Sequence, residues 1–198
     1  MGYYLRVLSP DERAVAAGIL TEAAAGFGCR ITGGTPSGDW SFFEVVNRSG
    51  EIPCTVERNV VEKGSIGEEE ISAFKEEIAD CLPRAGAEWL RAYLENVRTI
   101  YVIQVFDEVY SDDGWSAVRG IMEAIRDVAG GIIQADGEGF SNEEGYQILW
   151  QFSDHVDGEW WMAVLHGSRW EKFKMDLGNK AHRSAFKAGE IPVGVERA

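Results

Sequence analysis

The order of secondary-structure signals repeats once along this chain, and the repeat limits the folds that the chain can adopt. Each half shows a strand, a helix and three further strands, because runs of aromatic and β-branched residues flank one stretch of helical periodicity. The predicted strands are residues 3–8, 29–32, 40–47 and 52–60 in the first half and residues 100–106, 132–135, 146–152 and 159–165 in the second. The matching pairs Tyr3–Tyr101 and Gly50–Gly158 keep the same order. We therefore predict an α+β fold made by internal duplication of two β-α-β-β-β units.

The duplication also predicts how the chain is divided. We expect a single compact unit with pseudo-repeats at residues 1–62 and 98–166, a two-helix connector at residues 65–97 and a C-terminal extension at residues 167–198. The capping box Ser65-Ile66-Gly67-Glu68 opens the first connector helix, and Pro83 ends it.

The extension allows two interpretations over residues 168–177. Alternation of Phe173 and Met175 with charged residues favours a strand, whereas Ser168 and Glu171 would form the capping box of a helix. We prefer the strand and expect a short helix at residues 180–187.

Local signals also predict the first helix and the centre of the sheet. Ser9, Pro10 and Glu12 form a helix start, followed by Val15, Ile19, Ala23 and Phe27 at helical spacing on the expected buried face. Residues 100–106 are almost unbroken apolar, which is typical of a strand covered on both faces.

Acidic residues follow two predicted strands of the second half. Asp107 and Glu108 end the strand at 100–106, and Asp136 and Glu138 follow the strand at 132–135. A right-handed crossover between these strands would bring their carboxyl ends side by side. Carboxylates gathered there repel one another unless a cation or a basic partner relieves them. We therefore take these four acids as candidate binding residues, with helix capping and solvated turns as the alternative.

Tryptophans crowd the last third of the chain, and Trp160 is the fifth candidate binding residue. Trp160 and Trp161 are adjacent on a predicted strand, so their side chains point to opposite faces. Either helices cover both faces, or one of the two rings lies on a surface suited to a partner.

Composition excludes several classes of protein. The 198 residues are 45% hydrophobic, enough for a folded core without disulfides. Nineteen basic residues against 33 acidic ones give a net charge of −14, which argues against a nucleic-acid partner. No apolar run is long enough for a membrane span, and three widely spaced cysteines are typical of a cytoplasmic protein.

The paired β-α-β-β-β order resembles the vicinal-oxygen-chelate (glyoxalase-like) family, with paired ferredoxin-like modules as a second possible arrangement. That family takes His, Gln or Glu metal ligands from the first and last strands of its units. The first strand here has none, and Gln104 and Glu57 are the only such residues in comparable strands. The resemblance implies a fold, but no metal and no cofactor.

These observations favour a non-catalytic acidic protein that binds a basic protein partner, as an immunity protein or inhibitor does. The sequence shows no catalytic constellation, so an enzyme is the less favoured interpretation. The alternative is a small-molecule or metal-binding protein, possibly an enzyme, with its site at the strand ends of the second half. Association of several copies stays open.

Overall fold

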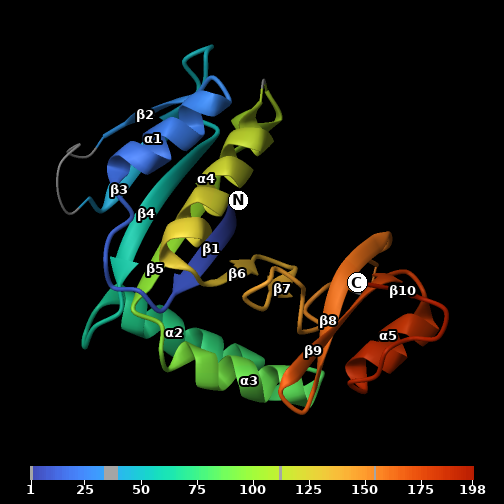
Figure 1. Ribbon diagram of the computed structural model, residues 1–198. Helices are drawn as coiled ribbons and strands as arrows, with labels where there is room; N and C mark the ends of the chain where they lie inside the picture. The colour runs from blue at the N-terminus through green and yellow to red at the C-terminus, as the bar shows by residue number, and fades with distance from the viewer. Residues whose placement is uncertain (1, 34–39, 112, 154) are drawn as a thin grey trace. The chain divides into compact units, whose positions relative to one another are not determined.

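The computed structural model describes residues 2–33, 40–111, 113–153 and 155–198 and confirms the mixed α+β class (Figure 1). The strands are β1 (Tyr3–Ser9), β2 (Arg30–Thr32), β3 (Phe42–Val46), β4 (Cys54–Val60), β5 (Thr99–Val105), β6 (Ile132–Ala135), β7 (Gly139–Phe140), β8 (Glu159–His166), β9 (Arg169–Asp176) and β10 (Glu196–Arg197). The helices are α1 (Ala17–Gly26), α2 (Ile66–Glu77), α3 (Arg84–Leu94), α4 (Gly114–Ala129) and α5 (Lys180–Lys187), with short 3-10 helices η1 (Ile78–Asp80) and η2 (Asp107–Tyr110).

Over the described residues, the strands ordered β2-β3-β4-β5-β1 form an antiparallel sheet, β6 pairs with β7, and a three-stranded sheet is ordered β10-β9-β8. The chain divides into two compact units. The first unit comprises Met1–Glu69 and Val97–Gly131, and the second comprises Glu70–Asn96 and Ile132–Ala198. These boundaries differ from those of the predicted repeats, and each unit is described separately below.

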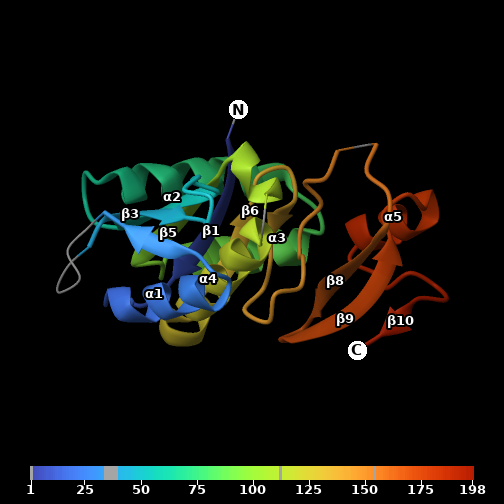
Figure 2. The ribbon, with the colours of Figure 1, turned by 90° about the horizontal axis from the view of Figure 1, so that it is seen from above.

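In the first unit, β5 lies between β1 and β4 and pairs with both in antiparallel register. Its apolar side chains are buried on both faces, which confirms the central strand predicted at residues 100–106. Figure 2 shows α1 and α4 on the same side of this sheet. The other unit-one strands, β3 and β2, continue the sheet beyond β4.

The predicted start of the first helix was wrong, because α1 begins at Ala17 and not after Ser9. Tertiary contacts take the backbone groups that a helix would use. The Val15 amide donates to the Tyr101 hydroxyl at 3.1 Å, and the Val15 carbonyl accepts from Trp40 Nε1 at 2.6 Å. The Ser9 hydroxyl donates to the Ala129 carbonyl at 2.6 Å and therefore anchors the end of α4.

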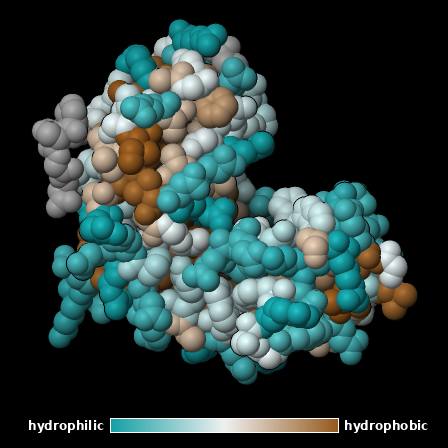
Figure 3. All heavy atoms as spheres, in the orientation of Figure 1, coloured by the Kyte–Doolittle hydropathy of each residue, from teal (hydrophilic) through white to brown (hydrophobic). Residues whose placement is uncertain are grey.

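The expected buried face of this helix is confirmed only in part, because Val15 is fully buried but precedes α1. Ala17, Leu20 and Ala24 are buried, whereas Ile19 and Phe27 are each more than one-third exposed. Figure 3 shows apolar side chains gathered on the face where α1 lies. Phe27, which follows α1, packs against α4, because a Cβ on Gly120 would lie 2.3 Å from its ring.

The connector helices agree with the sequence. The Glu68 amide donates to the Ser65 hydroxyl at 3.1 Å and the Glu68 carboxylate accepts from the Gly64 amide at 2.7 Å, so Ser65 caps α2 as predicted. The 3-10 helix η1 then ends before Pro83, and α3 follows. None of the helices in the described part of the chain is long and apolar enough to cross a bilayer.

The strand predicted at residues 146–152 was wrong. Within that stretch the described backbone makes only isolated bridges, from Gln147 to Ser141 and to Met162. The Trp150 amide instead donates to the Leu82 carbonyl at 2.8 Å. A Cβ on Gly86 would lie 2.6 Å from the Ile148 carbonyl oxygen, so α3 packs directly on this backbone. The Gln147 amide donates to the Trp161 carbonyl at 3.3 Å and the Ile148 amide to the Phe140 carbonyl at 3.0 Å. The backbone groups of the segment are thus satisfied by several different elements and not by one ladder.

The internal duplication is not confirmed. The prediction matched the strand at 159–165 to the strand at 52–60. In the structure β8 pairs with β9 in the smaller sheet, whereas β4 pairs with β3 and β5 in the larger sheet. The two proposed copies therefore agree in their first elements and differ in where their last strand pairs.

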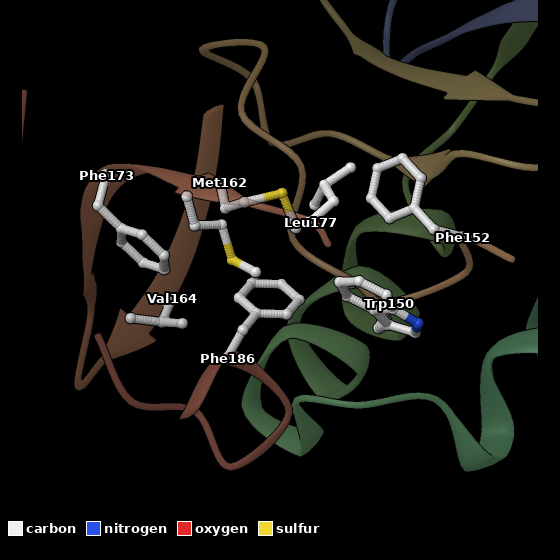
Figure 4. Close-up of a cluster of buried hydrophobic side chains, with 8 residues drawn as sticks. Trp150, Phe152, Met162, Val164, Phe173, Leu177 and Phe186 are labelled. Atoms are coloured by element: carbon white, nitrogen blue, oxygen red, sulfur yellow. The ribbon is translucent and has the colours of Figure 1, made fainter. Parts of the chain in front are cut away.

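The C-terminal extension confirms the preferred strand and the short helix, which are β9 and α5. Strands β8 and β9 form a hairpin with His166 opposite Arg169. Figure 4 shows the apolar side chains of this hairpin, together with the Trp150 ring, gathered near Phe186 of α5. The buried cluster is Trp150, Phe152, Met162, Val164, Phe173, Met175, Leu177 and Phe186.

Candidate functional site

A hollow of about 480 Å³ in the first unit is lined by the side chains of three glutamates, Glu44, Glu51 and Glu108. The other lining residues are Gly50, Ile52, Thr55 and Phe106, so the described lining contains no basic residue. We call this site the acidic hollow.

Strand pairing brings the three glutamates together. Glu44 lies on β3 opposite Thr55 of β4, and Glu51 lies in the turn that joins these strands. The first residue of β4, Cys54, is opposite the last residue of β5, Val105. The β3–β4 turn therefore lies beside the segment that follows β5, where η2 carries Glu108.

Hydrogen bonds fix the Glu51 carboxylate in the hollow. Asn47 Nδ2 donates to Glu51 Oε2 at 3.1 Å, and the Ser111 hydroxyl lies 2.8 Å from the same oxygen. The Glu51 amide donates to Asn47 Oδ1 at 2.8 Å, which closes the turn around the buried Asn47 side chain. Ser111 Oγ also lies 2.7 Å from the Glu108 carbonyl oxygen. The turn and η2 are thus connected through one hydroxyl.

These contacts lower the pKa of Glu51 below its usual range. The largest cause is the hydrogen bond from Asn47, and the second is the hydrogen bond from Ser111. Because the folded state lowers this pKa, the stability that Glu51 contributes is present above its ordinary pKa and is lost as the pH falls through the lowered value. Glu51 is therefore ionised at neutral pH.

Substitution Ser111→Ala is expected to raise the pKa of Glu51 toward its ordinary value, because one of the two donors is removed. The pKa should stay below that value, since the Asn47 donor remains. An NMR titration of the Glu51 side-chain carboxyl carbon measures this change, and Ser184→Ala on α5 is the control. An unchanged Glu51 titration in Ser111→Ala would show that the hydroxyl does not stabilise the carboxylate.

The structure places the four predicted acids in two units. Asp107 and Glu108 are exposed on η2 in the first unit, where Glu108 lines the acidic hollow. Asp136 and Glu138 lie in the turn between β6 and β7 of the second unit, where both are half-buried. Asp136 Oδ1 lies 3.5 Å from Gln134 Nε2, and the Glu138 carbonyl accepts from Gln147 Nε2 at 3.2 Å. The gathering of all four acids stays a prediction.

No group of three or more His, Cys, Asp or Glu side chains in the described ranges is arranged to hold a metal ion. The three glutamates of the acidic hollow thus surround a space without converging on one point.

The two adjacent tryptophans of β8 point to opposite faces, as expected for a strand. Trp160 is 37% exposed, and its ring centroid lies 5.6 Å from that of Phe152. Trp161 is half-buried beside Tyr146, with 5.9 Å between ring centroids. Trp160 is thus accessible to a partner, and its use in binding stays a prediction.

Sequence analysis missed Glu44, Glu51 and the two residues that hold Glu51. A partial signal was present, because Asn47 and Glu51 flank the predicted hairpin turn, and Asn side chains commonly hydrogen-bond backbone amides a few residues on. Nothing local indicated Ser111, which is 60 residues away from Glu51.

Comparison with known proteins adds no relative: no protein-family model, no curated protein and no solved structure matches this chain.

Proposed function

We propose that this chain is a non-catalytic acidic binding protein, of the immunity- or inhibitor-like kind, whose acidic hollow receives a basic side chain of a protein partner. The observation that carries the proposal is the set of three glutamates around one hollow, with the Glu51 carboxylate held in place by Asn47 and Ser111. A Lys or Arg side chain of the partner would place its charge among the carboxylates.

The lining suits such a side chain in its apolar part as well. Phe106 and Ile52 offer apolar surface beside the glutamates, and the stems of Lys and Arg pack well on such surface. Because hydrogen bonds already hold Glu51 in place, little side-chain freedom is lost when a partner binds. The net charge of −14 adds long-range attraction, which raises the rate of encounter with a basic protein.

The experiment uses the purified chain as bait for proteins in a cell extract. The double variant Glu51→Gln/Glu108→Gln removes two charges from the acidic hollow. Its matched control, Glu22→Gln/Glu123→Gln, removes two exposed charges from α1 and α4. We expect basic proteins to bind the natural chain and the control, and to bind the hollow variant at least about tenfold more weakly, because each lost charge pair is a charge-assisted contact.

Salt provides the second criterion. Binding to the natural chain should weaken as NaCl is raised, because screening reduces attraction between exposed charges. Capture of no basic protein, equal loss in both double variants, or affinity that does not depend on salt would contradict the proposed function.

Two further proposals concern origin and location. We infer that the strand, helix and two strands that open each half derive from one duplicated segment, which is supported by their shared element order. Superposition of residues 3–46 on residues 99–140 tests this, and a failure of the two segments to superpose would contradict it. We also infer a cytoplasmic location, which is supported by the three widely spaced free cysteines Cys29, Cys54 and Cys81. Fractionation of cells that express the chain tests the location.

A further inference from the structure

Helix α5 carries a cluster of basic side chains that the proposed function does not use. Lys180, Arg183, Ser184 and Lys187 share one face of α5, since they lie three or four residues apart, and together they line a hollow of about 370 Å³. We call this site the basic hollow. The charge is unusual for this chain, because residues 127–168 contain eight acidic residues and neither Lys nor Arg.

The second unit holds this helix firmly. Phe186 of α5 is fully buried in the cluster of Figure 4. Asn179 caps the helix, because its Oδ1 accepts from the amides of Ala181 at 2.9 Å and His182 at 3.4 Å. Since these amides are occupied by the cap, any ligand of the basic hollow would be held by side chains.

Trp150 orients two of the three cations. The guanidinium carbon of Arg183 lies 5.8 Å from the Trp150 ring centroid, and Lys187 Nζ lies 4.9 Å from it. Arg183 also donates to the Gly178 carbonyl at 3.2 Å. Two like charges are therefore kept near one ring, an arrangement that an anion would stabilise.

Neighbouring lysines of the same unit differ from those of α5. Lys172 and Lys174 of β9 form ion pairs with Glu144 and Glu159, the second at 2.5 Å. The described residues provide no carboxylate partner for Lys180 or Lys187. The charges of these two lysines are thus available to a ligand.

We propose that the basic hollow binds the phosphate groups of a small molecule and prefers a diphosphate to a single phosphate. Lys180 and Lys187 are about 10 Å apart along the helix axis, so two phosphate groups reach both ends better than one. Arg183 adds a third positive charge beside Trp150, which suits phosphate oxygens, whereas the Ser184 hydroxyl already donates to the Lys180 carbonyl at 2.9 Å. A long polyanion is disfavoured because the chain as a whole carries −14.

The test is isothermal titration calorimetry of the whole chain with pyrophosphate and with inorganic phosphate at low salt. We expect pyrophosphate to bind more tightly. Variants Lys180→Gln and Lys187→Gln should each weaken pyrophosphate binding about tenfold, because each removes one charge-assisted contact. The control Lys174→Gln removes the same charge from the same unit outside the hollow and should leave the affinity within about twofold.

Several outcomes would overturn the proposal. They are the absence of pyrophosphate binding, equal weakening by the control, and affinity so low that it represents an adventitious ion only. Self-association of the chain that Lys180→Gln abolishes, in the absence of pyrophosphate binding, would assign the face to a protein contact instead. Circular dichroism establishes that the variants are folded. If Lys187→Gln unfolds, the Lys180→Gln variant alone decides the test, because the Lys180 side chain is exposed.

Discussion

Substitution Phe173→Ala is expected to lower the free energy of unfolding of the second unit by about 3–5 kcal/mol, the usual cost of removing a buried aromatic ring. Phe173 has no exposed surface, and its ring centroid lies 6.4 Å from that of Phe186. The loss combines buried apolar area with a cavity between β9 and α5 that the hairpin cannot close, because main-chain pairing fixes its two strands.

Urea unfolding, followed by hydrogen exchange of the β8 and β9 amides, measures this effect in the second unit. Val193→Ala is the control, since Val193 is 96% exposed and its truncation should change the unfolding free energy by no more than about 0.5 kcal/mol. A loss below about 1 kcal/mol for Phe173→Ala would mean that the ring does not belong to a packed core.

Substitution Gly114→Ala is expected to destabilise the first unit by about 3 kcal/mol, because the new methyl group would meet main chain and not a movable side chain. A Cβ on Gly114 would lie 2.4 Å from the Val109 carbonyl oxygen and 2.8 Å from the Val109 Cα. Relief requires α4 to move away from η2, which carries Glu108.

Gly18→Ala provides the opposite result in the same unit. Gly18 lies in α1, and a Cβ there would meet no atom within 4 Å. Alanine should therefore stabilise the helix by about 0.5–1 kcal/mol through its better helix propensity. Thermal unfolding monitored by circular dichroism compares the two variants. Equal effects from both substitutions would be inconsistent with the close approach of η2 to α4.

Local patterns predicted much of the secondary structure. The apolar run of β5, the Ser65 cap of α2 and the short helix α5 each depend on residues a few positions apart. Such interactions act in the same way whatever the rest of the chain does. The start of α1 could not be predicted in this way, because Trp40 and Tyr101 take the Val15 backbone groups from distant parts of the chain.

The same distinction between local and long-range interactions applies to the residues of the acidic hollow. Glu108 could be singled out from sequence, since it follows a strand that is recognisable by itself. Glu44 and Glu51 could not, because they reach Glu108 only through the register of β4 against both β3 and β5. Side chains alternate between the two faces of a strand. This pattern indicates a strand, but it does not identify the strands that pair with it.

By itself, the sequence determined the α+β class, the strong negative charge, the capped connector helix and most strand positions. The tertiary structure alone decided that β8 pairs with β9, that the Trp150 amide donates to the Leu82 carbonyl, and that Ser111 holds Glu51. The physical reason is the separation in sequence between the residues that interact. Periodicity and capping are settled within one or two turns of chain, whereas strand partners and the donors of a buried or clustered carboxylate come from residues far apart in sequence.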